Sequence, residues 1–175
     1  MIGNEVNCLK KVGRFQLKEA NTQCQSFNAN QILPRSRLES DNLVSALLSL
    51  DLDSETGNTL VSIGIYKTQE EEWSEFTGQL ISFFNWAPNE PDNHGGNENY
   101  AGLSVNEINR TIHWADYNGT VEINVVCTKR SGQGKYGSKF EPRTVGGVGI
   151  VPTSLSNRVK LIDQPLCKPF NFSGN

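Results

Sequence analysis

The segment NWAPNEPDNHGGNENY, residues 85–100, contains three carboxylates, five Asn, two Pro and two Gly in sixteen positions. Proline removes a backbone donor and glycine adds conformational freedom, so a run of this composition forms neither a helix nor a regular strand. Irregular loops of this length inside a compact domain usually carry function. The sequence therefore poses two questions: which fold holds this loop, and why the loop is so acidic.

The length of the chain and its charge distribution suggest one domain with an extension. The chain has 175 residues, which is one ordinary domain with additional length. Residues 1–130 carry 10 Lys and Arg against 17 Asp and Glu, a net charge of −7, and residues 131–175 carry 6 against 2, a net charge of +4. The second part is rich in Gly, Ser and Pro without sustained periodicity. We predict a domain at 1–130 and a basic extension at 131–175.

Composition and motifs argue against several classes of function. An acidic domain is unsuited to nucleic acid, because nucleic-acid binding requires a basic surface. No apolar run approaches the roughly 18–20 residues of a membrane span. The two histidines, His94 and His113, lie outside any HExxH or GxSxG context. We therefore expect neither an enzyme nor a membrane-spanning protein.

The cysteines and three glycosylation sequons favour a secreted protein. The four cysteines, at 8, 24, 127 and 167, are even in number and include no CxxC pair, which argues against a metal or redox pair. The sequons begin at Asn109, Asn118 and Asn171. Disulfides and glycans both belong to the extracellular compartment, so we expect a secreted glycoprotein.

Two helices are predicted early in the chain. In FQLKEANTQCQSFN, residues 15–28, the apolar positions Leu17, Ala20, Cys24 and Phe27 have 3-4-3 spacing, which predicts an amphipathic helix. In PRSRLESDNLVSALLSL, residues 34–50, Ser36 and Glu39 form a capping box. The inner stripe of this second helix is expected at Leu43, Leu47 and Leu50.

Strands are predicted on either side of a long irregular region. TLVSIGIYK, residues 59–67, alternates at Val61, Ile63 and Ile65, and VEINVVC, residues 121–127, alternates in the same way. Between them lie some fifty residues rich in Asn, Gly and Pro, interrupted by short strand-like pieces at 79–86 and 111–116. The order of two helices followed by short strands around a long loop indicates an α+β domain.

The acidic residues of the loop suggest a calcium site. Glu90, Asp92 and Glu98 lie in the Pro-bounded loop, and Asp116 follows in HWADYNG. Ca²⁺ takes six to eight hard oxygen ligands, and irregular backbone is suited to bringing them together. Clustered carboxylates repel one another without a cation. The alternative is a solvated acidic loop in which these side chains never meet.

The motifs and their order resemble those of the C-type lectin-like domain family. SIGIYK stands where the family has its WIGL strand, and EEEWSEFTGQLISFFNWAPNEPD follows the long-loop pattern ending in N-W-x-x-x-x-P. WAD stands for the WND motif, and NVVCTKR for the closing strand with its terminal Cys. The resemblance covers residues 8–129. It implies a double-looped fold with two helices, small antiparallel sheets, a long irregular loop and adjacent termini.

The resemblance also implies a disulfide pattern. The family's bridge from the first helix to the last strand corresponds here to Cys24–Cys127, which closes a loop of 103 residues. The family's second bridge, which staples the long loop, is absent, because its two positions match Tyr100 and Gly119. The unmatched Cys8 and Cys167 are then expected to pair and to tie the tail back beside the N-terminus.

By the same resemblance the calcium and sugar site maps onto the loop. Its metal ligands are expected at Glu90, Asp92, Glu98 and Asp116, with Pro91 as a cis proline, and its sugar-binding residues at Glu90, Asp92, Asn93 and Glu98. The family's E-P-N motif is E-P-D in this chain, and its WND motif is WAD. Asp92 and Ala115 therefore lack the amide N–H groups that donate to a sugar's hydroxyl oxygens in the family.

We therefore expect a secreted recognition module that binds Ca²⁺ in its long loop and a carbohydrate through that site. The alternative is a lectin-like module that binds a protein through the loop surface and has no sugar activity. The retained Glu90, Pro91, Glu98 and Asp116 favour the first interpretation, whereas Asp92, Ala115 and the missing second bridge favour the other.

Overall fold

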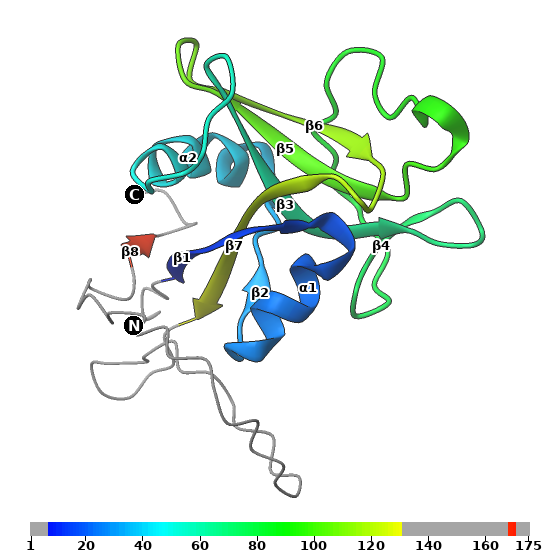
Figure 1. Ribbon diagram of the computed structural model, residues 1–175, viewed down its shortest axis with the longest axis horizontal. Coiled ribbons are helices and arrows are strands. Elements are labelled where there is room, and N and C mark those ends of the chain that lie inside the picture. The colour runs from blue at the N-terminus through cyan, green and yellow to red at the C-terminus, as the bar shows by residue number, and fades with distance from the viewer. Residues whose placement is uncertain (1–6, 131–167, 171–175) are drawn as a thin grey trace, which may run out of the picture.

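The computed structural model describes residues 7–130 and 168–170. The described chain contains two α-helices, one short 3-10 turn and eight strands, which occur in the order β1 (Asn7–Gln16), α1 (Leu17–Ser26), β2 (Asn30–Gln31), α2 (Arg37–Leu48), β3 (Asn58–Lys67), β4 (Trp73–Glu75), the 3-10 turn (His94–Gly96), β5 (Tyr100–Asn106), β6 (Thr111–Tyr117), β7 (Glu122–Arg130) and β8 (Lys168–Phe170) (Figure 1). The predicted α+β class with two helices is confirmed.

The strands form one mixed sheet in the order β6-β5-β3-β7-β1-β8, with β2 beside β7 and β4 beside β3. Its strand pairs are antiparallel, except that β3 and β7 are parallel where Val61 pairs with Asn124. This contact joins the strands β6, β5 and β3 to the strands β7, β1 and β8. The first and last long strands lie side by side, with Asn7 opposite Arg130. The two ends of the 7–130 body are therefore adjacent (Figure 1).

The first helix is fixed to the sheet by its apolar face. Leu17, Ala20 and Cys24 are buried, as their spacing predicts. Cys24 is bonded to Cys127 of β7 with a Cα–Cα distance of 5.4 Å, the pair that the resemblance implied. Phe27 lies just beyond the helix as its C-cap. The helix therefore packs on β7 both by burial and by a covalent bond.

The second helix begins at the predicted cap. The hydroxyl of Ser36 accepts a hydrogen bond from the Glu39 N–H. The Glu39 carboxylate in turn accepts from the N–H of Arg35 at 2.6 Å, one residue before the position that a standard capping box uses. The helix buries Leu43 and Leu47.

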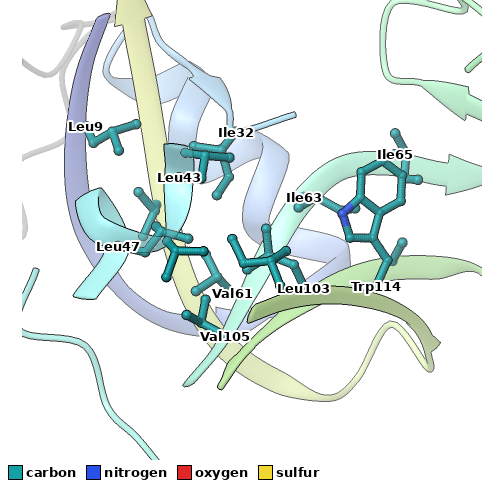
Figure 2. Packing of buried hydrophobic residues seen from close by; sticks show 14 residues of the cluster. Leu9, Ile32, Leu43, Leu47, Val61, Ile63, Ile65, Leu103, Val105 and Trp114 are labelled. Atoms are coloured by element: carbon teal, nitrogen blue, oxygen red, sulfur yellow. The ribbon is translucent and has the colours of Figure 1, made fainter. Parts of the chain in front are cut away.

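The main core lies between α2 and strands β3, β5 and β6. Figure 2 shows Leu43 and Leu47 of α2 facing Val61 of β3, with Trp114 of β6 at the opposite end of the cluster. Burial of each such aliphatic side chain contributes roughly 1.5–3 kcal/mol relative to exposure. This core also supports the start of the long loop, because Trp86 of the loop packs against Trp114 of β6.

Five strands and one irregular segment differ from the sequence-based expectation. Strands β1, β2, β4, β5 and β8 were not predicted, whereas a strand-like piece was predicted at 79–86. That piece forms only isolated contacts, Leu80 with Ser74 and Trp86 with Trp114. The rings of Phe83 and Trp86 pack against the main core, whereas Phe84 is exposed. The other predicted piece, 111–116, lies within β6.

The part of the predicted extension that the structure describes returns to the sheet. Strand β8 pairs antiparallel with β1, and Pro169 lies opposite Cys8. The remainder of the predicted extension, including Cys167 and Asn171, lies outside the described residues. Neither helix of the described chain is long and apolar enough to span a membrane.

Candidate metal site

The start of the long loop is held against β6. Asn85 is buried, and its side-chain amide donates to the Ile112 carbonyl at 2.7 Å. Backbone bonds from Trp114 N–H to Asn85 and from Ala87 N–H to Trp114 continue the attachment, each at 2.8 Å. The Trp86 ring packs edge-on against Trp114 with centroids 5.7 Å apart. The acidic residues thus follow a segment whose position is fixed by the core.

Three predicted metal ligands meet at the loop. Glu90, Asp92 and Asp116 each offer a carboxylate oxygen, and these atoms lie within 4.8 Å of one another. Glu90 and Asp92 come from the loop, on either side of the cis peptide bond at Pro91, and Asp116 comes from β6. The alternative in which these acidic side chains never meet is therefore wrong for these three.

Asp116 is the organising acid of the group. It is buried, and its two carboxylate oxygens accept the backbone N–H groups of Asp92 and Asn93, each at 3.0 Å. Two backbone amides on one carboxylate fix its position and orientation. The backbone that carries Asp92 is therefore positioned by β6.

Glu98 lies beside this group but is not one of the three. Its Oε2 accepts from the His94 N–H at 2.6 Å, and the same N–H donates to Asp92 Oδ1 at 3.0 Å. The Glu98 N–H donates to Asn93 Oδ1 at 3.0 Å. That bond uses the oxygen of the Asn93 amide and not its N–H donors. The structure thus places Asn93 and Glu98 next to the acidic group.

Mutual repulsion and burial affect protonation in this loop. Burial raises the pKa of Glu90, and the nearby Asp116 and Asp92 raise it further. The pKa of Glu98 is also raised, first by burial. On β6, burial raises the pKa of Tyr117, and the nearby Glu90, Glu98 and Asp116 raise it further. The ion pairs of the described chain include none of these carboxylates.

The donor set fits a hard divalent cation. Glu90 Oε2 is buried and has no hydrogen-bond partner among the described residues. An unpaired buried carboxylate oxygen is costly, and a cation would compensate it. Ca²⁺ prefers carboxylate, carbonyl and water oxygens. Ala115 supplies no side-chain oxygen, so a calcium ion here would complete its coordination with water or a ligand.

An aromatic ring lies where the sequence predicted a missing disulfide. A Cβ atom placed on Gly119 would lie 2.6 Å from Cε2 of Tyr100 and 3.3 Å from Cβ of Lys18. The Tyr100 ring is therefore in direct contact with the Gly119 backbone. The end of the loop is packed against the turn before β7, although a covalent bridge is absent at these positions.

The predicted glycosylation sites have different surroundings. Asn109 lies exposed in the turn between β5 and β6. Asn118 is half-buried, and its side-chain oxygen accepts from the N–H and the hydroxyl of Thr120. Cys8 is disulfide-bonded, and its predicted partner Cys167 is outside the described residues.

Sequence reasoning missed two residues that shape the site. Asn85 anchors the loop, and Tyr117 stands among the acids. The position of Asn85 directly before Trp86 could have indicated an anchor. No local sequence signal indicated Tyr117, because its proximity to Glu90 and Glu98 depends on the path of the loop.

Comparison with known proteins identifies the fold. The structure is similar to the mouse scavenger receptor C-type lectin carbohydrate-recognition domain, with a TM-score of 0.58 and 21% sequence identity, over 74% of this chain and 93% of that one. It is similar to the C-type lectin CEL-I from Cucumaria echinata, with a TM-score of 0.55 and 18% identity, over 73% and 91% of the chains.

A third similar structure was solved with a sugar. It is the C-type lectin domain of murine dendritic cell inhibitory receptor 2 in complex with N-glycan, with a TM-score of 0.56 and 16% identity, over 75% of this chain and 99% of that one. No family model and no curated protein matches the sequence. At these identities the likeness establishes the fold.

Proposed function

Because the chain has the C-type lectin-like fold, we propose that it is a secreted recognition module that binds Ca²⁺ in its long loop and a carbohydrate through that calcium. The fold supports recognition of a carbohydrate or a protein. Disulfide bonding supports an extracellular location. The similar solved structures include a carbohydrate-recognition domain and a C-type lectin, which supports binding and not catalysis as the role of this chain.

The convergence of Glu90, Asp92 and Asp116 carries the calcium proposal. Their oxygens lie within 4.8 Å of one another, and Glu90 Oε2 is buried without a partner among the described residues. Glu98 lies near enough to join them, because it shares the His94 N–H with Asp92. A bound calcium ion would neutralise the acids and present open coordination positions to sugar hydroxyls.

The residues beside the metal would set the choice of sugar. A vicinal diol bound to calcium can donate its protons to Glu90, Asp92 or Glu98. Its oxygens also require N–H donors, which Asp92 and Ala115 do not supply. The side-chain oxygen of Asn93 accepts from the Glu98 N–H. This bond does not use the two N–H donors of the Asn93 side chain, which a ligand could accept from. Because Asn93 is one amide where Asp92 and Ala115 leave two donors missing, we infer weak binding of simple monosaccharides by the native loop.

Calcium titration tests the metal site. Millimolar Ca²⁺ should raise the melting temperature of the metal-free protein, because a ligand that binds only the native state stabilises it. At a concentration about 100 times the Kd the gain is about 2.7 kcal/mol. Glu90→Gln and Asp116→Asn should reduce the gain.

Glu70→Gln is the matched control, because it removes an exposed carboxylate outside the loop. It should retain the full response to calcium. An unchanged melting curve together with no heat of binding in calorimetry would reject the metal site and favour a protein-binding module that works without calcium.

Restoring the missing donors tests the sugar site. Asp92→Asn together with Ala115→Asn should create or strengthen calcium-dependent binding of mannose-type sugars, because each added amide supplies N–H donors beside a carboxylate. An unpaired acceptor shielded from water costs roughly 1–3 kcal/mol, so the gain should be about tenfold or more. The single Asp92→Asn change should give less.

A glycan array with calcium, and again with EDTA, measures this effect for the native protein and both variants. Tight binding of monosaccharides by the native protein with no gain in the double variant would show that the donors come from elsewhere in the loop. The assignment of Asp92 and Ala115 would then be wrong.

A further inference from the structure

A large cavity lies apart from the acidic loop. It has a volume of about 960 Å³ and lies between α1, β2, the end of β7 and the turn that follows β4. In Figure 1 these elements occupy the lower half of the view, whereas the long loop is at the upper right. None of the loop carboxylates lines the cavity. Its volume is at the upper end of the range for small-molecule sites, so it has room for a ligand larger than one sugar ring.

Residues with side-chain amides are the most frequent kind in the described walls of the cavity. Seven of its 17 described lining residues are Asn or Gln. They include Asn21 and Gln25 of α1, Asn30 and Gln31 of β2, and Gln79 after β4. The Gln31 amide is buried and bonds to Ile63, Ser62 and Asn21 within the protein. The exposed carboxamides of Gln25, Asn30 and Gln79 each carry N–H donors and a carbonyl acceptor. A hydroxyl group also donates and accepts, so these walls match a polyhydroxylated ligand.

The charges in the cavity are balanced. Two acids and two bases are among its described lining residues. Arg35 pairs with the buried Glu75 at 2.6 Å, and the Glu39 carboxylate accepts from the Arg35 N–H. Neither sign of charge is in excess among these described residues. The cavity therefore favours a neutral ligand over a phosphate-bearing or strongly basic one.

An aromatic ring and a buried hydroxyl complete the lining. Phe76 borders the cavity, and its ring is held by stacking on Tyr66 with centroids 5.0 Å apart. An aromatic ring packs well against the apolar C–H face of a sugar. Thr128 Oγ1, on the β7 side, is buried without a hydrogen-bond partner among the described residues. A ligand hydroxyl would satisfy it.

An extended peptide fits this cavity less well. Peptides that bind as added strands require an exposed sheet edge. Strand β2 pairs with β7 on one side, and the next residue, Ile32, accepts from the Gly64 N–H of β3 on the other. Ser74 of β4 pairs with both Tyr66 and Leu80. The polar groups offered to a ligand are therefore mainly side-chain amides.

We propose that this cavity is a second, calcium-independent binding site for a neutral oligosaccharide, held by the amides of α1, β2 and the turn after β4 and by the ring of Phe76. The proposal does not depend on the metal site in the long loop. It gives the molecule two separate sugar-binding surfaces, of which only the loop would respond to chelation.

The test uses the full chain in EDTA, so that the loop site does not contribute. A glycan array of neutral oligosaccharides of about three to six units provides the probes, and each hit is titrated against ¹⁵N-labelled protein. Binding in the cavity should shift the side-chain amide signals of Gln25 and Gln79 and the backbone signal of Gly64. Signals of Asn93 and Asn97 in the loop should stay in place.

The double variant Gln25→Ala with Gln79→Ala removes two exposed amides and should lower the affinity about tenfold, as the loss of two hydrogen bonds predicts. Phe76→Ala should also weaken binding. Gln69→Ala removes an exposed amide that does not line the cavity and should leave the affinity unchanged.

Three outcomes would overturn the proposal. The first is that no neutral oligosaccharide binds in EDTA. The second is that binding in EDTA shifts the loop signals and is insensitive to the Gln25 and Gln79 changes. The third is that an extended peptide, and no oligosaccharide, shifts the cavity signals. Loss of the calcium response in the loop would affect none of these readings.

Discussion

Glu90 shows how a single residue depends on its neighbours. Its carboxyl group is partly buried, one of its oxygens lacks a partner among the described residues, and Asp92 and Asp116 stand beside it. Burial and both neighbouring charges raise its pKa. In the metal-free protein the charged form of Glu90 is therefore less favourable than in the unfolded chain.

This pKa shift predicts how metal-free stability depends on pH. Between the ordinary pKa of a glutamate and the raised value, the folded state binds more protons than the unfolded state. The contribution of Glu90 to stability is therefore present below the ordinary pKa and is lost as pH rises through the folded pKa. Urea unfolding in EDTA from about pH 4 to about pH 7 measures it.

Glu90→Gln should reduce this loss and make the metal-free variant more stable than the native protein at the upper end of the range. Saturating Ca²⁺ should reverse the trend, because the metal requires the ionised carboxylate. Glu70→Gln is the control and should follow the native profile. A native profile that does not decline in EDTA would contradict the description of Glu90 as a destabilised acid.

At the scale of elements, β5 and β6 present the loop without the family's second disulfide. Tyr100 begins β5, directly after the loop, and Gly119 follows β6. The ring of Tyr100 lies so close to Gly119 that no side chain fits there. A ring packed on a glycine replaces a covalent bond by a contact, which holds the loop end only while the strands are folded.

Gly119→Ala should therefore destabilise the protein. The added methyl group would meet the Tyr100 ring, and overpacking of this kind costs about 1–3 kcal/mol. In the Tyr100→Ala background the same change should cost much less, because the ring is gone. A double-mutant cycle by thermal unfolding measures the coupling between the two positions.

Equal costs of Gly119→Ala in both backgrounds would mean that the ring and the glycine do not interact. The backbone angle of Gly119 is not in the left-handed region, so the cycle reports on contact and not on backbone strain.

The elements differ in how far the sequence could predict them. The helix with Leu17, Ala20 and Cys24 and the strand with Val61, Ile63 and Ile65 have clear periodicity, and both are confirmed. Strand β1 was missed because NCLKKVGRFQ is mostly polar and contains a bulge near Gly13. The segment 79–86 was misread because Ile81, Phe83 and Trp86 pack on the core as residues of a strand would, although the backbone forms only isolated bridges.

The candidate site was predictable in its residue types but not in its geometry. The carboxylates and Pro91 followed from motifs at fixed spacing. The bonds from Asp116 to two loop amides could not be predicted, because they join residues 24 and 23 positions apart. The amide-lined cavity had no local signal at all, since Gln25 and Gln79 come from distant parts of the chain.

At the scale of the whole molecule, the fold is closed where its two ends meet. Strand β1 pairs with β7 from Asn7 to Gln16, and the Cys24–Cys127 bond joins α1 to the same strand. Strand β8 then adds three residues to the outer edge of β1. Two layers of attachment thus hold the ends, one inside the 7–130 body and one between that body and the tail.

These two layers should respond differently when their cysteines are removed. The Cys24–Cys127 bond closes a separation of 103 residues, so Cys24→Ala with Cys127→Ala should cost about 4–5 kcal/mol in the chain-entropy model. Cys8→Ala with Cys167→Ala should leave the body folded and its calcium response intact, because β1 is paired with β7 independently of the tail. Denaturant unfolding compares the two variants.

The pairing itself is tested by peptide mapping without reduction. Cys8 is disulfide-bonded, and Cys167 directly precedes β8, whose residues pair with Asn7, Cys8 and Leu9. We therefore expect one linked peptide pair containing Cys24 and Cys127 and another containing Cys8 and Cys167. A peptide in which Cys8 is linked to Cys24 would contradict both assignments. A free thiol at Cys167 would contradict only the second, and the tail would then be held at the sheet edge by β8 alone.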